Sequence, residues 1–214
     1  IVESIEVIGG TNVQWAHDPK TDRDIIIEIN PRTSRSSALA SKATGFPIAF
    51  VSAMLAAGLT LADIPCGKYG TLDKYVPDGD YIVLKFARWA FEKFKGVEDK
   101  LGTQMRAVGE VMSIGKTYKE AFHKAIRSLE TGRYGLGPCR DFDKRTKDER
   151  LRLLATPSSE RYFAMYEALR TGAAVEELHE ITKVKHYFIR QMKELVEEEE
   201  ELLGFKGGLP SDEA

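Results

Sequence analysis

Three oxygen-bearing side chains on two neighbouring segments have the types and spacing to bind a metal ion: Gln14, Glu28 and Asn30. Residues 24–29 are rich in isoleucine and predict a buried strand, and alternation along a strand puts Glu28 and Asn30 on the same face. A carboxylate on such a strand is costly to bury without a partner, and Gln14 could face it from a neighbouring strand. Amide and carboxylate oxygens suit Mg²⁺, which completes its shell with phosphate and water.

Two arginines, Arg32 and Arg35, follow at once after the predicted strand. Guanidinium groups beside a cluster of oxygen ligands suit a phosphate or another oxyanion. The same residues are also compatible with an edge strand that carries solvated polar side chains and a surface arginine pair. Spacing alone leaves both interpretations open.

Strands and helices alternate in the first part of the chain. Residues 1–8 have the alternation of a strand, and residues 13–16 and 24–29 predict an antiparallel hairpin. Further strands are predicted at 81–86 and 108–114, and a helix at 47–57 before Gly58. Thr60 with Asp63 and Thr117 with Glu120 have the spacing of capping pairs, the second opening a helix that Gly132 ends.

The character of the sequence changes near Gly132. Residues 133–140 have the composition of a linker, and helices are predicted from Thr156-Pro157, at 175–179, and from Thr182 to the acidic run 197–201. The fold class is therefore α+β. We expect an antiparallel sheet with flanking helices over residues 1–131 and an all-α segment over 132–214.

Composition narrows the functional classes. The chain has 214 residues, 43% of them hydrophobic, which is enough for a real core, and its formal charge of −2 gives no overall attraction to nucleic acid. No apolar run approaches the roughly 18 residues of a membrane span. Two cysteines, Cys66 and Cys139, exclude a disulfide scaffold and a four-cysteine zinc site, and favour the cytoplasm.

Three stretches carry a resemblance to a known family. Residues 28–45 (EINPRTSRSSALASKATG) resemble the large subunit of carbamoyl phosphate synthetase, in the ATP-grasp half that makes carboxyphosphate. Residues 9–14 (GGTNVQ) and 103–112 (TQMRAVGEVM) resemble flanking stretches of that domain, in the same order. Glu-x-Asn-Pro-Arg is shared with other ATP-grasp enzymes, whereas the Ser- and Ala-rich continuation is specific. The resemblance is strong to about residue 131, and the remainder resembles the start of the oligomerization domain.

The resemblance implies roles for individual residues. Gln14, Glu28 and Asn30 match metal ligands, with Glu28 bridging two divalent ions, Mg²⁺ or Mn²⁺, on the phosphates of ATP. Arg32 and Arg35 match the arginines beside bicarbonate and carboxyphosphate. Met105 and Glu110 match positions near the tunnel for carbamate, although a structural ion pair is an equally good interpretation of Glu110.

The resemblance also implies a function and partners. The expected function is part of an ATP-dependent ligase of arginine and pyrimidine synthesis, which phosphorylates bicarbonate on the way to carbamoyl phosphate. The expected partners are the rest of the large subunit, a glutaminase small subunit and further copies through the helical segment. The glycine-rich phosphate loop of the family is absent from this sequence, so we expect a fragment that is inactive by itself.

Two alternatives remain at this stage. The chain could be a non-catalytic assembly piece that contributes helices to an oligomer. It could also belong to another ATP-grasp carboxylase, such as a biotin carboxylase, against which residues 36–45 argue.

Overall fold

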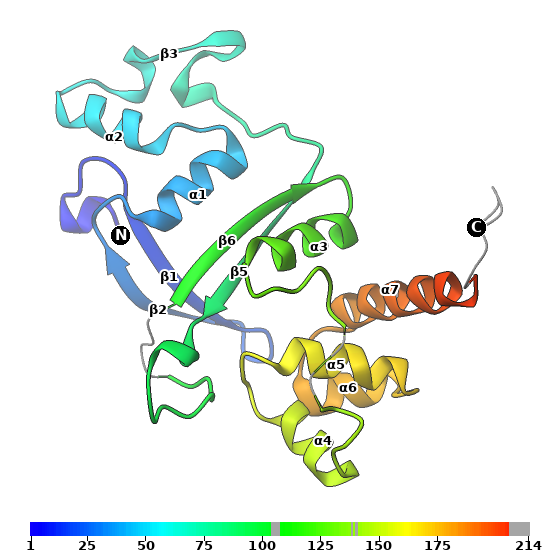
Figure 1. Cartoon of the computed structure of the whole chain (residues 1–214). Coiled ribbons are helices and arrows are strands. Elements are labelled where there is room, and N and C mark those ends of the chain that lie inside the picture. The colour runs from blue at the N-terminus through cyan, green and yellow to red at the C-terminus, as the bar shows by residue number, and fades with distance from the viewer. Residues whose placement is uncertain (104–107, 138, 140, 206–214) are drawn as a thin grey trace. The chain divides into compact units, whose positions relative to one another are not determined.

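The computed structural model describes residues 1–103, 108–137, 139 and 141–205, and the chain divides into two units, residues 1–80 and 81–214 (Figure 1). Each unit has its own hydrophobic core, built from residues of that unit alone. The predicted α+β class is confirmed, with small antiparallel sheets in both units and helices throughout. The predicted domain boundary at residue 131 concerns the domains of the family and stays a prediction.

Unit 1 begins with a 3₁₀ turn, Glu3–Ile5, followed by the hairpin of β1 (Asn12–Asp18) and β2 (Arg23–Asn30). The predicted hairpin is confirmed, but the strand expected over residues 1–8 does not form. Alternation alone was insufficient there, because a strand also needs a partner for its backbone groups.

The predicted burial of β2 is wrong in this chain. Ile25, Ile26 and Ile27 are exposed, Ile27 to 63%, while Ile29 is half-buried, and among the described residues β2 pairs with β1 alone. A β-branched run satisfies the steric preference for strand, but burial also requires a layer that covers the strand.

Two helices follow the hairpin: α1 (Arg35–Thr44) and α2 (Ile48–Ala56). Ser34 and Ser37 form a capping box at the start of α1, and Gly45 ends that helix with φ of +78°. No single helix in the described part of the chain is long and apolar enough to cross a membrane; only α1 and α2 counted together, bent by 112°, reach that length and composition.

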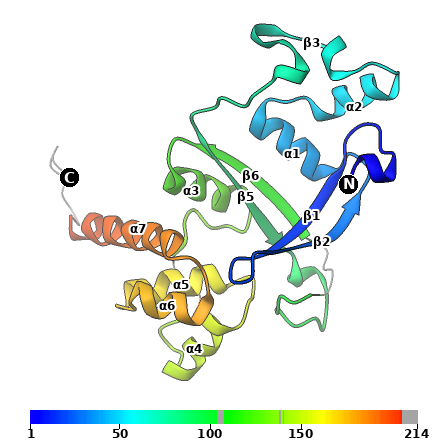
Figure 2. The ribbon, with the colours of Figure 1, turned by 180° about the vertical axis from the view of Figure 1, so that it is seen from behind.

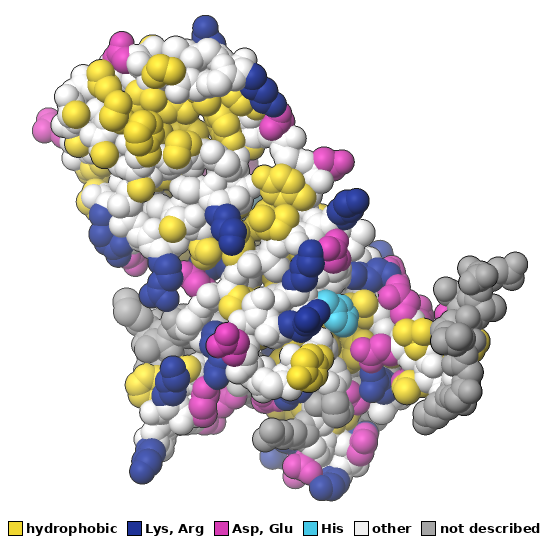
Figure 3. Space-filling model, turned by 45° about the horizontal axis from the view of Figure 1, so that its top comes forward, with side chains coloured by type: hydrophobic (Ala, Val, Ile, Leu, Met, Phe, Trp, Pro, Cys, Tyr) yellow, Lys and Arg dark blue, Asp and Glu magenta, His cyan; other side chains and the backbone are white. Residues whose placement is uncertain are grey.

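A small core holds the rest of unit 1 together around Val51, Ile64 and Leu72, beside the short pair β3 (Pro65–Cys66) and β4 (Gly70–Thr71). The predicted pair of Thr60 and Asp63 is confirmed, since the Thr60 N–H donates to the Asp63 carboxylate over 2.8 Å. Hydrophobic side chains also gather at the surface of this unit (Figure 3).

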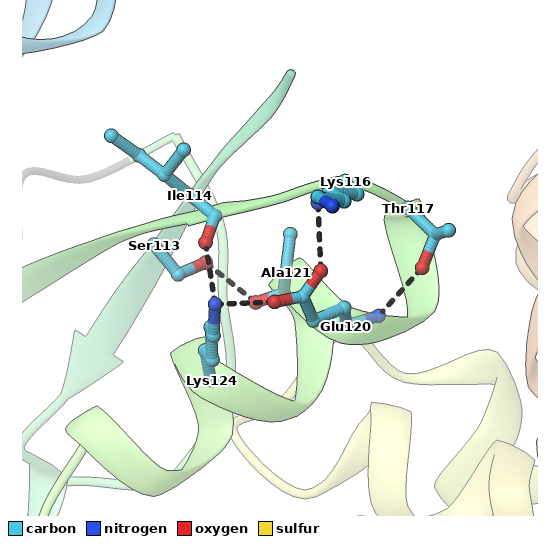
Figure 4. Close-up of polar contacts among 7 residues, drawn as sticks. All are labelled: Ser113, Ile114, Lys116, Thr117, Glu120, Ala121 and Lys124. Atoms are coloured by element: carbon cyan, nitrogen blue, oxygen red, sulfur yellow. Dashed lines mark hydrogen bonds and ion pairs between the residues drawn. The ribbon is translucent and has the colours of Figure 1, made fainter.

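Unit 2 begins with the antiparallel pair β5 (Ile82–Trp89) and β6 (Val108–Gly115), both predicted, and α3 (Tyr118–Ser128) packs on this pair (Figures 1 and 2). At the start of α3 the Glu120 N–H donates to the Thr117 hydroxyl over 3.2 Å, as expected of a cap. The Glu120 carboxylate accepts from the Lys116 N–H, one residue earlier than a standard capping box requires (Figure 4).

Side chains also join α3 to β6. Lys124 donates to the Ile114 carbonyl over 3.0 Å and pairs with Glu120, while Ser113 donates to the Ala121 carbonyl (Figure 4). These contacts fix the strand-to-helix connection. The helix ends at Ser128, four residues before Gly132, because Glu130 already adopts a left-handed conformation with φ of 55°.

Four more helices follow in the described part of the unit: α4 (Lys147–Ala155), α5 (Arg161–Arg170), α6 (Val175–Thr182) and α7 (His186–Gly204). These helices share one hydrophobic core with α3 and β5. The large side chains that are fully buried in this core are Phe122, Ile126, Leu136, Met165, Tyr166, Leu178, Ile189 and Met192.

Two predicted helix starts are wrong. Thr156 ends α4 instead of beginning the next helix, which starts at Arg161. Thr182 is the last residue of α6, because its hydroxyl donates back to the Leu178 carbonyl over 2.6 Å and Lys183 then turns left-handed with φ of 59°. The last helix therefore starts at His186.

A buried acid lies beside this core. Glu167 is only 5% exposed, its Oε1 atom has no hydrogen-bond partner among the described residues, and the nearest Arg170 nitrogen is 3.7 Å away. Burial raises the pKa of Glu167, and the negative charges of Asp143 and Glu199 act in the same direction, against Arg170.

Phe122→Ala should lower the free energy of unfolding of unit 2 by about 3–5 kcal/mol, the usual cost of a cavity of this size. Both variants are made in a Trp15→Phe background, which leaves Trp89 as the one tryptophan. The fluorescence of Trp89 then reports the unfolding of unit 2 in a urea titration. Tyr134→Ala is the control, since that ring is 85% exposed. Equal effects of the two substitutions would contradict the assignment of Phe122 to the core.

Glu167 should make unit 2 less stable as pH rises. Because its folded pKa is raised, its contribution to stability is fully present below the unfolded pKa and is lost as pH climbs through the folded value. Glu167→Gln should therefore flatten the decline of unfolding free energy between mildly acidic and neutral pH. The exposed Glu177→Gln on α6 should leave the profile unchanged, and a wild-type profile for Glu167→Gln would refute the account.

Candidate metal and phosphate site

The hairpin register brings the three predicted oxygen ligands together. Gln14 lies directly opposite Glu28, and Asn12 lies opposite Asn30. Directly opposed residues of an antiparallel pair share a face, with Cβ atoms about 4.5–5.5 Å apart. The Asn30 amide also donates to the Glu28 carboxylate. One face of the hairpin therefore gathers one carboxylate and three amides.

Asn12 is the member of this set that the sequence reasoning missed. It stands two residues before Gln14 on the same strand, so the alternation that grouped Glu28 with Asn30 would also have grouped Asn12 with Gln14. What the sequence did not give is the register, which sets Asn12 against Asn30.

An irregularity in β2 separates this polar end from the rest of the hairpin. The pairing shifts between Gln14 and Trp15, so that Trp15 faces Ile26 and Ile27 is the extra residue. Such bulges re-aim side chains and are frequent beside functional sites. The register before the shift is secured by the Thr11 hydroxyl, which donates to the Asn30 carbonyl over 3.0 Å.

The predicted arginines lie where β2 passes into α1. The Arg32 N–H donates to the Asn30 carbonyl over 2.8 Å, which bends the chain away from the strand, and Arg35 is the first residue of α1. Both side chains are exposed. Two guanidinium groups and the N-terminal end of a ten-residue helix thus follow the oxygen cluster, and both features favour an anion.

The donor set fits a hard divalent cation. All of its donors are oxygens, and it holds a single carboxylate, which suits an ion that keeps phosphate and water among its ligands. In the described ranges, the hairpin included, no three His, Cys, Asp or Glu side chains gather in a way that could hold a metal ion, so any site here depends on amide oxygens beside the one carboxylate.

The two predicted tunnel residues are Glu110 and Met105. Glu110 lies on β6 and is half-buried, with its carboxylate 2.5 Å from Nζ of Lys85 on β5. The ion pair expected as the alternative interpretation is therefore present, and a tunnel role stays a prediction. Met105 lies outside the described residues.

Other candidate chemistry in the chain is weak. Cys66 and Cys139 are free thiols, as expected, and burial raises the pKa of Cys139, so it is no activated nucleophile. His17 lies within β1 and contacts Asp24 at 2.9 Å. His179 and His186 stack with ring centroids 3.9 Å apart, a contact that their sequence spacing did not predict.

Comparison with known proteins decides the family. Residues 1–64 match the family model "Carbamoyl-phosphate synthase L chain, ATP binding domain", and residues 110–213 match "Carbamoyl-phosphate synthetase large chain, oligomerisation domain". A carbamoyl phosphate synthase large chain of Thermotoga neapolitana is 48% identical over 94% of this chain. The chain belongs to the carbamoyl phosphate synthase large-chain family.

Two further relatives show how much of the family this chain represents. The large chain of Archaeoglobus fulgidus is 50% identical over 91% of this chain, and the N-terminal section of the large chain of Methanopyrus kandleri is 44% identical over 98%. The chain spans 18% of the length of the Archaeoglobus and Thermotoga relatives and 37% of the Methanopyrus section. The five predicted metal and anion residues and Asn12 all lie within the ATP-binding match.

The Thr11 hydroxyl should hold the polar end of the hairpin. Thr11→Val keeps the shape of the side chain but removes the hydrogen bond to the Asn30 carbonyl. The free energy of local opening at this end of the hairpin should fall by about 0.5–1.5 kcal/mol. Amide hydrogen exchange over Asn12–Gln14 and Glu28–Asn30 would measure it. Unchanged exchange there would show that the hydroxyl does not secure the register.

Proposed function

We propose that this chain supplies the metal- and phosphate-binding part of the site where the parent large chain phosphorylates bicarbonate with ATP. The product would be carboxyphosphate, on the way to carbamoyl phosphate, so the parent is an ATP-dependent ligase. The observation that carries the proposal is the pairing of Gln14 with Glu28 on the hairpin, followed at the strand end by Asn30 and the two arginines.

Gln14, Glu28 and Asn30 would hold two divalent ions, Mg²⁺ or Mn²⁺, with Glu28 as the charged ligand of the set. When bound, such ions neutralise the charge of the ATP phosphates that must approach the anionic nucleophile. The Asn30 amide orients the Glu28 carboxylate through its hydrogen bond. A fixed carboxylate loses less conformational entropy on binding than a mobile one.

Arg32 and Arg35 would hold bicarbonate and then carboxyphosphate. Planar guanidinium groups match the paired oxygens of a carboxylate-like anion, and the backbone N–H groups at the start of α1 add positive potential. Fixed donors aimed at developing negative charge need no reorganisation during the reaction.

The ligands lie open in this chain, because Gln14 and Glu28 are exposed. Carboxyphosphate is labile, so a working site must exclude water. We therefore propose that the chain is inactive alone and that the rest of the large subunit covers the hairpin face.

Membership in this family also suggests partners, a pathway and a location for the parent protein. We propose a glutaminase small subunit as partner, a carbamate path past Glu110 and Met105, a role in arginine and pyrimidine synthesis, and a cytoplasmic location. The match over residues 110–213 also supports a structural role, in which α3–α7 contribute to an oligomer. This assembly role is compatible with the catalytic one. Family membership removes the biotin carboxylase alternative.

Glu28→Gln in the parent large chain should lower bicarbonate-dependent ATP hydrolysis about 100-fold or more, because it removes the one charge of the ligand set while keeping its shape. Asp24→Asn is the matched control, since it makes the same chemical change on the same strand, at the other end of the hairpin. Asp24→Asn should stay within about twofold of wild type.

The two variants separate catalysis from folding. A loss in Glu28→Gln alone would support the metal role. A wild-type rate for Glu28→Gln would refute it, and equal losses in both variants would show that the hairpin tolerates no loss of charge, which also contradicts the assignment.

A further inference from the structure

The oxygen cluster and Arg35 belong to different elements, so something must hold hairpin β1–β2 against the helix pair α1–α2. They approach each other closely at Gly10, just before β1. A Cβ atom at Gly10 would lie 2.9 Å from Oγ of Ser52 on α2 and 3.0 Å from Cγ2 of Thr33. The backbone of Gly10 therefore packs directly against the side chains of Ser52 and Thr33, which leaves no room for a larger residue at position 10.

The Ser52 hydroxyl makes two directed hydrogen bonds at this contact. It donates to the Ile48 carbonyl within α2 over 2.8 Å and accepts from the Gly10 N–H over 2.8 Å. Because its proton points into the helix, its lone pair is aimed at Gly10. The backbone next to the metal-ligand strand is thus bonded to α2 through this single hydroxyl.

The bonding continues on both sides. The Ile48 N–H, at the start of α2, donates to the Ser41 hydroxyl of α1 over 3.1 Å. On the hairpin side, the residue after Gly10 is Thr11, whose hydroxyl reaches the Asn30 carbonyl. An unbroken series of hydrogen bonds and backbone therefore links the helix that starts with Arg35 to the strand that ends with Asn30.

We propose that Ser52 is a positioning residue that sets the distance between the oxygen cluster of the hairpin and the anion-binding start of α1. It touches neither metal nor substrate and acts through Gly10. The inference rests on the proposed function, because it assumes that the hairpin and α1 bind one polyphosphate and anion complex together.

The test uses the parent large chain with Ser52→Ala. Bicarbonate-dependent ATP hydrolysis should fall about 3- to 10-fold in kcat, and the free Mg²⁺ concentration for half-activation should rise by a similar factor, as expected for one lost hydrogen bond. The matched control is Ser128→Ala on α3. That hydroxyl also donates to a carbonyl four residues back, over 2.8 Å, so it controls for loss of a helix hydroxyl alone.

Glu28→Gln measured alongside separates the two claims. A rate that is lost in Glu28→Gln and kept in Ser52→Ala overturns the positioning role alone. A rate kept in both overturns the proposed function and the positioning role with it. Equal losses in Ser52→Ala and Ser128→Ala also overturn the positioning role.

A double-mutant cycle with Gly10→Ala keeps the test decisive if Ser52→Ala lowers the melting temperature. Gly10→Ala places a Cβ against Oγ of Ser52 and Cγ2 of Thr33, so the cycle is measured in a Thr33→Ser background, in which Oγ of Ser52 is the nearest atom to that Cβ. If both act through one contact, the double variant should be no slower than the worse single variant. Additive losses would overturn the proposal.

Discussion

The register of hairpin β1–β2 is the constraint on which the candidate site depends. Oxygen ligands from two strands converge only if Gln14 is opposite Glu28 and Asn12 opposite Asn30. A slip by one residue would turn every side chain of one strand to the other face and scatter the set. The irregularity after Gln14 confines this register to the polar end, so the isoleucines beyond it can pair differently without disturbing the ligands.

Unit 2 is stabilised in a different way from the hairpin. Its order comes from one continuous core that α3, α5, α6 and α7 share with β5, and from polar contacts that fix the passage from β6 to α3. Arg170 adds a further link within the unit. It approaches the buried Glu167 and also pairs with Glu199 and Glu200 of the acidic run on α7. Part of the acidic run therefore balances the positive charge of Arg170.

Much of this arrangement could be predicted from the sequence. The hairpin, α2, β5, β6 and the start of α3 follow from periodicity and capping residues, and the ATP-binding and oligomerisation matches confirm the family that the motif at residues 28–45 indicated. Local rules failed where a long-range contact or a competing local bond decided the outcome. Thr182 has the type of a helix cap but bonds back into its own helix, and residues 1–8 alternate like a strand but form no ladder. Neither the exposure of β2 nor the contact of Ser52 with Gly10 has a local sequence pattern.

The most direct test of the central claim is to locate the cations. Crystals of the parent large chain grown with Mn²⁺, ADP and phosphate would show manganese by its anomalous scattering. The account predicts a manganese peak within bonding distance of the Glu28 carboxylate, with Gln14 or Asn30 also in the coordination shell. Nucleotide and manganese bound together elsewhere, with no peak at Glu28, would contradict it.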